Sequence, residues 1–171
     1  GVDACPVHVE VDVSFGMPAF TMVGLPDASV RESRDRVKSA IRNSGFEFPA
    51  HRITVNLAPA DVRKAGSSFD LPIALGILAA SGRIPREALQ GCEFYGELSL
   101  NGELRPIRGM LPTVCRAAKA SHRVVLPHAN FAEASLVEGA PIAAAKYLLE
   151  ICNHLKGLTP LTFVRQDRGT G

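Results

Sequence analysis

The sequence predicts one α/β (α+β) domain in which helices pack against a mixed β-sheet. Three observations support this fold class. The chain has 171 residues, of which 46% are hydrophobic, so one domain can bury a sizeable core. Segments that alternate apolar and polar residues, as half-buried strands do, are separated by segments with a helical apolar pattern. The dipeptide Asn101-Gly102 is the strongest short hairpin signal.

Several segments have the pattern of a β-strand. In the first, apolar residues alternate with polar residues from Val7 to Phe15, which predicts a strand with one exposed face. Ile53, Val55 and Leu57 alternate in the same way. Gly and Pro residues bound most of these segments. The predicted strands, in chain order, are residues 7–15, 20–23, 53–57, 94–100, 103–105, 124–126 and 141–143.

Helices are predicted between these strands. The first helix is expected to be capped by Ser29, which has the spacing of a capping box with Glu32, or alternatively by Asp27. The second begins near Asp70 with Pro72 in its first turn, and it is apolar nearly all round, so we expect it to be deeply buried. The first helix is expected to stop at Gly45, and the later helices are expected at residues 111–120, 131–137 and 145–155.

The composition argues against several classes of protein. Nineteen basic and seventeen acidic residues give a net charge of +2, which is too balanced to imply nucleic-acid or membrane binding by charge alone. The four cysteines are widely spaced, which predicts free thiols in a reducing compartment rather than a zinc ribbon or a disulfide framework. The longest uncharged apolar stretch, residues 71–80, is shorter than the roughly 20 residues that span a bilayer. We therefore expect a cytoplasmic protein with no membrane partner.

Two clusters of polar residues are candidates for chemistry. Ser68 follows Gly66 and precedes the buried helix, where backbone N–H groups can form an oxyanion hole. A plain helix cap is the alternative, and local sequence favours it because a serine nucleophile also needs a base. His8, Glu10 and Asp12 share one face of the first strand, but no further ligand is in evident reach, so no metal site is expected.

Basic residues form a stripe on the first helix. Arg31, Arg34, Lys38 and Arg42 recur at helical spacing and are candidates for contacts with nucleic-acid phosphates. The alternative is a solvated face braced by i,i+4 pairs, such as Glu32 with Arg36. The chain has no Trp and two Tyr, which argues against a stacking platform for single strands. A second basic region comprises Arg105, Arg108, Arg116, Lys119 and Arg123.

The motifs resemble a known family. Gly66-x-Ser68 before the buried helix, followed by residues 96–107 and Gly109, resembles the Lon-protease proteolytic fold, which is also that of a ribosomal-protein second domain. More closely, nearly the whole chain is similar to the N-terminal, Lon-protease-like domain of the YifB/ComM magnesium-chelatase-like AAA+ ATPases. The runs that carry this resemblance are VGLPDA (23–28), RESRDRV (31–37), NSGFEFP (43–49), ITVNLAPAD (53–61) and GSSFDLPIALG (66–76).

The resemblance implies that Ser68 is a vestigial position. Active Lon enzymes pair this serine with a lysine on the helix after the hairpin, and the matching position here is Leu111, which cannot accept a proton. Asp70 is expected to add a negative charge next to a developing oxyanion, which is the wrong sign for stabilisation. We therefore expect no catalytic residue in this chain. A peptidase of the Ser-Lys type using Ser68 and a subunit of a magnesium chelatase are the alternatives.

The resemblance also implies a larger parent protein. It would be a hexameric AAA+ ATPase that acts as a DNA branch-migration helicase in natural transformation and homologous recombination. Because the chain contains no phosphate-loop motif, ATP and Mg²⁺ are expected only in the AAA+ domain, and no cofactor is expected here. Residues 1–158 are interpreted as one Lon-like N-terminal domain and residues 159–171 as a linker. The expected partners are the protein's own AAA+ domain, neighbouring protomers of a homo-hexamer and DNA.

Overall fold

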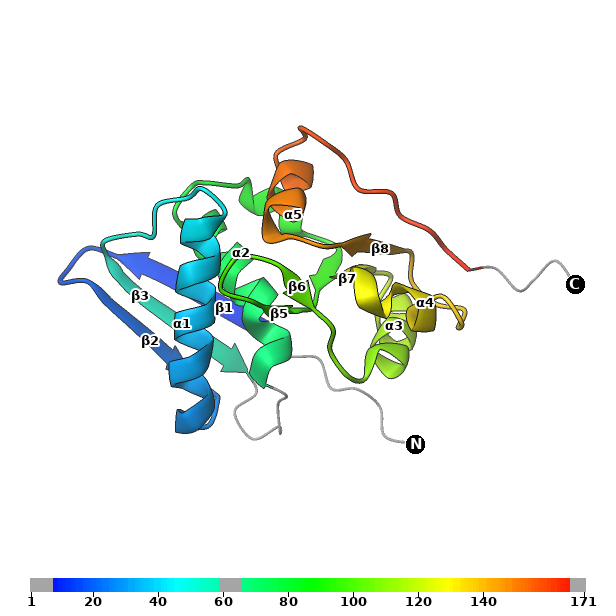
Figure 1. Cartoon of the computed structure of the whole chain (residues 1–171), viewed down its shortest axis with the longest axis horizontal. Coiled ribbons are helices and arrows are strands. Elements are labelled where there is room, and N and C mark those ends of the chain that lie inside the picture. The colour runs from blue at the N-terminus through cyan, green and yellow to red at the C-terminus, as the bar shows by residue number, and fades with distance from the viewer. Residues whose placement is uncertain (1–7, 59–65, 167–171) are drawn as a thin grey trace, which may run out of the picture.

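The first half of the chain folds into a mixed three-stranded sheet. The computed structural model describes residues 8–58 and 66–166 (Figure 1). The sheet comprises β1 (His8–Ser14), β2 (Ala19–Val23) and β3 (Arg52–Ala58) in the order β1-β3-β2. β1 is antiparallel to β3, whereas β2 is parallel to it. The alternation seen in the sequence turns Val9, Val11 and Val13 of β1 and Ile53, Val55 and Leu57 of β3 towards the core. In β2, Phe20 and Met22 face the core, whereas Val23 is 51% exposed.

Two helices pack with this sheet. α1 (Asp27–Asn43) follows β2, and α2 (Asp70–Ala80) lies against β1 and α1. Both predicted caps, Ser29 and Asp27, are wrong, because α1 starts at Asp27 and Pro26 is its N-cap. The carbonyl of Pro26 accepts hydrogen bonds from the amides of Ser29 and Val30 at 2.9 and 3.1 Å. The predicted burial of α2 is confirmed, since its apolar residues face the core all round.

The second half of the chain forms a parallel sheet with its own helices. β4 (Cys92–Phe94), β7 (Arg123–Pro127) and β8 (Ile142–Ala145) pair in the order β4-β7-β8. α3 (Met110–Lys119) precedes β7, α4 (Phe131–Ala134) lies between β7 and β8, and α5 (Leu148–Leu155) follows β8 (Figure 1). Parallel neighbours need such crossover connections.

The predicted strand 94–100 is not continuous. The amide of Tyr95 still donates to the carbonyl of Val125 in β7, at 3.0 Å, but Gly96 turns away and pairs with the backbone at the start of α2. The chain then forms a separate hairpin from β5 (Glu97–Leu98) and β6 (Leu104–Arg105). The turn at Asn101-Gly102 is confirmed, and a hydrogen bond from Ser99 N to Glu103 O closes a three-residue loop in which Gly102 has φ +89°.

The fold class is confirmed as mixed α/β, but the strands of residues 8–58 and 66–166 lie in three sheets rather than in one mixed sheet. The helix predicted at residues 145–155 begins only at Leu148, because Ala145 belongs to β8. The helix predicted at residues 131–137 ends at Ala134. Within the described ranges, every helix is too short or too polar to cross a bilayer.

The first part of the predicted linker contacts the domain. Val164 exchanges two backbone hydrogen bonds with Ile142 in β8, each 2.8 Å long. The amide of Leu161 donates to His154 Nδ1 at 2.9 Å, and the Phe163 ring lies 4.5 Å from the guanidinium of Arg123. Val164 therefore forms an isolated antiparallel bridge at the β8 edge of the second sheet.

Candidate functional site

Ser68 lies in a short 3₁₀ helix, η1 (Gly66–Phe69), immediately before α2. The residue is buried, with 8% of its surface exposed. Its carbonyl accepts a hydrogen bond from Gly96 N at 3.1 Å, and the carbonyl of Gly96 accepts one from Leu71 N at 3.1 Å. The serine turn and the segment that enters the hairpin therefore lie side by side, which brings together the two regions that the sequence singled out.

Asp70 has a different role from the one that we expected. Its carboxylate is fully buried and accepts hydrogen bonds from Ser33 Oγ at 2.8 Å and from Leu98 N at 3.1 Å. Arg36 donates to both carboxylate oxygens, from Nε at 2.6 Å and from Nη2 at 3.2 Å. The structure thus gives Asp70 a partner that the sequence did not indicate, because Arg36 compensates the charge of the carboxylate, which also binds α1 and β5.

The buried pair shifts the acidity of both groups. Burial raises the pKa of Asp70 above its ordinary value, against the opposing hydrogen bonds from Arg36, Leu98 and Ser33. The hydrogen bond to Asp70 raises the pKa of the Arg36 guanidinium. Neither Ser33 nor Arg36 stood out in the sequence as a partner of Asp70, although both lie in a run that the family shares. The contact joins residues more than thirty positions apart.

Leu111 lies in the first turn of α3 and is partly buried. Its side chain has no atom that can accept a proton. α3 buries Met110, Val114 and Ala117 in a smaller hydrophobic cluster with β7 and β8, whereas α2 belongs to the larger cluster with the first sheet. The sequence position that resembles the Lon lysine is therefore occupied by an apolar residue on a helix of the second half.

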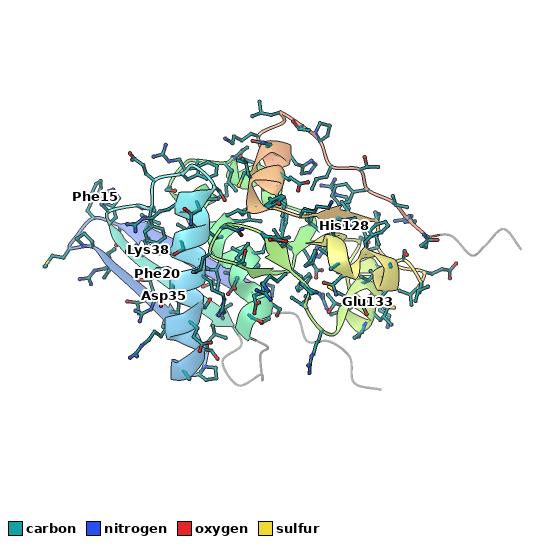
Figure 2. The ribbon with its side chains drawn as sticks, in the orientation of Figure 1. Phe15, Phe20, Asp35, Lys38, His128 and Glu133 are labelled. Atoms are coloured by element: carbon teal, nitrogen blue, oxygen red, sulfur yellow. The ribbon has the colours of Figure 1, made fainter. Side chains whose placement is uncertain are left out.

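The basic stripe on α1 is partly tied into the fold. Arg31, Lys38 and Arg42 are exposed, but Arg34 is half-buried and its Nη1 donates to the carbonyl of Phe20 at 2.9 Å. Lys38 Nζ lies 5.5 Å from the centre of the Phe48 ring. Figure 2 shows Lys38 and Asp35 on α1 beside Phe20 of β2.

A polar cluster that the sequence did not indicate lies between β4 and α3. Glu93 accepts hydrogen bonds from Tyr95 Oη at 2.5 Å and from Arg116, and His122 Nδ1 lies 2.7 Å from Glu93 Oε2. Burial acts to raise the pKa of Glu93, but the hydrogen bonds from Arg116, Tyr95 and His122 outweigh it and hold the pKa below its ordinary value. A cavity of about 380 Å³ adjoins this cluster, with Phe69 among its lining residues.

Three of the five residues of the second basic region form ion pairs or a cation–π contact within the domain. Arg116 pairs with Glu93, Arg105 pairs with Glu97 at 3.5 Å, and Arg123 lies over Phe163. In the parts of the chain that the structure describes, no three His, Cys, Asp or Glu side chains are placed to hold a metal ion.

Comparison with known proteins first identifies the class. An α/β domain with a serine turn before a buried helix and a hairpin beside it resembles a Lon proteolytic domain. The chain is 30% identical over 149 residues to Lon protease 2 of Bacillus subtilis. This match covers 82% of this chain and 26% of that protein. The Lon-like fold is thereby confirmed at a distance.

The family follows from a closer match. The family model described as subunit ChlI of Mg-chelatase matches residues 9–130, well over half of the chain, and the chain belongs to this family. It is 45% identical to the Escherichia coli (strain K12) protein named "Uncharacterized protein YifB" and 47% identical to competence protein ComM of Haemophilus influenzae. Each match covers 157 residues, which are 92% of this chain and 31% of the relative. The resemblance inferred from the motifs is confirmed.

Proposed function

We propose that this chain is the non-catalytic N-terminal domain of a ComM/YifB-like hexameric AAA+ ATPase. The observation that carries the proposal is the 47% identity to competence protein ComM over 92% of the chain. The parent protein acts as a DNA branch-migration helicase in natural transformation and homologous recombination, in the cytoplasm. ATP and Mg²⁺ bind in its AAA+ domain, and this domain serves ring assembly, coupling to the motor or contact with DNA.

The residue at the lysine position supports the non-catalytic part of the proposal. Leu111 occupies that position, and its side chain has no atom that can accept a proton from Ser68. A catalytic dyad without its base loses nearly all its rate advantage. The Gly96 contact with Ser68 acts in this proposal as a structural link between the serine turn and the hairpin.

An activity probe tests the non-catalytic assignment. The 171-residue chain and its Ser68→Ala variant are incubated with a fluorophosphonate probe, beside an active serine hydrolase as the positive control. We expect no labelling of either form, because a leucine in place of the lysine cannot activate the hydroxyl. Labelling of the wild-type chain that disappears in Ser68→Ala would establish a peptidase-like site and refute the proposal.

The exposed cations of α1 support the DNA-contact role. Arg31, Lys38 and Arg42 project from one stripe of the helix, and Arg34 holds the same stripe against β2. Cations in such a row contact successive phosphates without reading the bases. This role predicts binding that weakens as salt rises, because each neutralised phosphate releases counterions.

Filter binding at several salt concentrations tests the stripe. Replacing Arg31, Lys38 and Arg42 by Gln is expected to weaken duplex binding and to flatten the slope of log affinity against log salt by roughly 0.9 for each phosphate that the helix no longer neutralises. A matched variant with Gln at Arg108, Lys119 and Arg86 removes three exposed cations elsewhere and is expected to retain the slope. Equal slopes in wild type and the α1 variant would exclude α1 from the DNA interface.

A further inference from the structure

Two large apolar side chains are exposed together at one end of the molecule. They belong to the loop between β1 and β2, residues 15–18, which we call the β1–β2 loop. The exposed fraction is 92% for Phe15 and 81% for Met17. Figure 2 shows Phe15 at the outer end of the first sheet, away from the second half of the chain. Two large apolar side chains exposed on one short loop are candidates for an interaction site, because they contribute little to the core.

The β1–β2 loop is accompanied by an imidazole and a guanidinium. The ring of Phe15 meets the ring of His51 edge to face, with 5.5 Å between the ring centres. Arg52 is paired in the sheet with both Ser14 and Ala19, the residues that flank the loop. His51 and Arg52 are themselves exposed. The guanidinium of Arg52 on β3 is therefore adjacent to the β1–β2 loop.

A recess opens next to this loop. It has a volume of about 460 Å³, within the range of small-ligand sites, and His51 belongs both to its wall and to the Phe15 contact. Phe48, Pro49 and Arg83 also line it, and Glu47 on its rim lies 3.7 Å from Arg83. Glu47 is the only carboxylate among the described residues that line the recess, and its charge is paired with Arg83.

The recess is continuous with the basic stripe of α1. The rings of Phe48 and Phe20 are 5.4 Å apart, and Lys38 Nζ lies over the Phe48 ring. Neither Lys38 nor Arg52 forms an ion pair with the described residues. Contacts through His51 and Phe48 therefore connect two cations that no described carboxylate pairs, the exposed ring of Phe15 and the recess.

We propose that the β1–β2 loop and its recess bind single-stranded nucleic acid. The low Trp and Tyr content argues against a stacking platform, but the structure exposes the Phe15 ring, which can serve as one. Unpaired bases stack on Phe15, pack against Met17 and enter the recess beside His51, while Arg52 and Lys38 contact the phosphates. This inference rests on the DNA-contact role proposed above and names the form of DNA that the domain selects. The combination of apolar rings with these two cations favours nucleic acid over an apolar protein partner, because phosphates supply the negative charge and bases supply the stacking faces.

Fluorescence anisotropy with a labelled oligothymidine and with a duplex of equal length tests the proposal. The variants are Phe15→Ala combined with Met17→Ala, Arg52→Gln, and Leu158→Ala as the matched control. Leu158 is 67% exposed and follows α5, so it removes a similar apolar side chain elsewhere on the surface. All the replaced residues are exposed, so the variants are expected to fold, and circular dichroism checks this.

The two kinds of variant are expected to distinguish the contribution of base stacking to single-strand affinity from the contribution of phosphate contacts. The loop variant should lower single-strand affinity by roughly tenfold or more, with an unchanged salt slope, because stacking releases no counterions. Arg52→Gln should reduce the slope by about 1. Leu158→Ala should bind as the wild type does, and duplex affinity should change little in the loop variant.

Three results would overturn the inference. If the loop variant binds single strands as the wild type does while the α1 variant loses affinity, the β1–β2 loop is not a binding site and the α1 contact stands. If the wild-type chain binds neither oligonucleotide, the inference and the DNA-contact role both fall, and the non-catalytic assignment is judged by the activity probe alone. If the loop variant abolishes self-association in sedimentation without altering DNA affinity, the loop is a protein contact.

Discussion

At the scale of single residues, Asp70 shows how a position that suggests chemistry can instead hold the structure. Its carboxylate receives hydrogen bonds from Ser33 and Arg36 on α1 and from the Leu98 amide in β5. Three elements therefore meet at one buried anion at the start of α2. A buried charge of this kind is stable only while its partners remain, because an unpaired charge in the interior costs several kcal/mol.

Removing this carboxylate should destabilise the domain strongly. Asp70→Ala leaves the partly buried Arg36 without its partner and is expected to lower the free energy of unfolding by about 3–5 kcal/mol in urea titrations. Glu32→Ala removes the other, 76% exposed partner of Arg36 and should change stability by less than about 0.5 kcal/mol. Similar small losses in both variants would mean that the buried pair is not a structural link.

At the scale of secondary-structure elements, the β2–α1 connection depends on a close backbone approach. Gly24 has φ +102°, and a Cβ atom placed on it would lie 2.2 Å from the carbonyl oxygen of Leu57 in β3. Gly45, after α1, has a similar φ of +95° but has no neighbouring atom within 4 Å of the same position. An alanine at Gly45 would therefore introduce backbone strain alone, whereas an alanine at Gly24 would introduce both backbone strain and steric overlap.

The pair allows a matched test. Gly45→Ala should cost about 1–2 kcal/mol of unfolding free energy, because alanine is strained in a left-handed conformation. Gly24→Ala should cost about 1–3 kcal/mol more, because β2 and β3 must also move apart. Chemical denaturation of both variants measures the difference, and equal losses would show that the contact with Leu57 carries no energetic weight.

At the scale of the whole molecule, the described residues form a core of two hydrophobic clusters, and Glu93 connects elements from both. Phe94 of β4 belongs to the larger cluster, and Val114 of α3 belongs to the smaller one. The carboxylate of Glu93 on β4 binds Arg116 on α3, as well as Tyr95 and His122. This arrangement makes the contact between β4 and α3, where the two hydrophobic clusters meet, sensitive to acid.

The sign of the pH dependence follows from the lowered pKa of Glu93. A carboxylate with a depressed folded pKa contributes stability above its unfolded pKa, about 4.3, and loses it as pH falls through the folded value. Wild type should exceed Glu93→Gln in unfolding free energy by about 1.5–3 kcal/mol at neutral pH. Urea titrations across the acid range should show the gap closing below about pH 4.3. The exposed Glu10→Gln is the control, and a gap independent of pH would contradict this role.

Local pattern in the sequence determined much of this protein. The alternation at Val9, Val11 and Val13 set the inward face of β1, and the all-round apolar run after Asp70 set the burial of α2. Such features depend on neighbours in the chain, so periodicity reveals them. The motif runs also identified the family, and with it the serine turn and Leu111.

Only the tertiary structure decided which distant residues meet. The division into three sheets, the pairing of Asp70 with Arg36, and the cluster around Glu93 all join residues far apart in sequence. The contact between Phe15 and His51 is also one that only the tertiary structure decides, because the pairing of β1 with β3 brings the two rings together. The role of a buried charge or an exposed ring depends on the groups that tertiary packing places beside it. Because those groups are distant in the sequence, no local pattern predicts them.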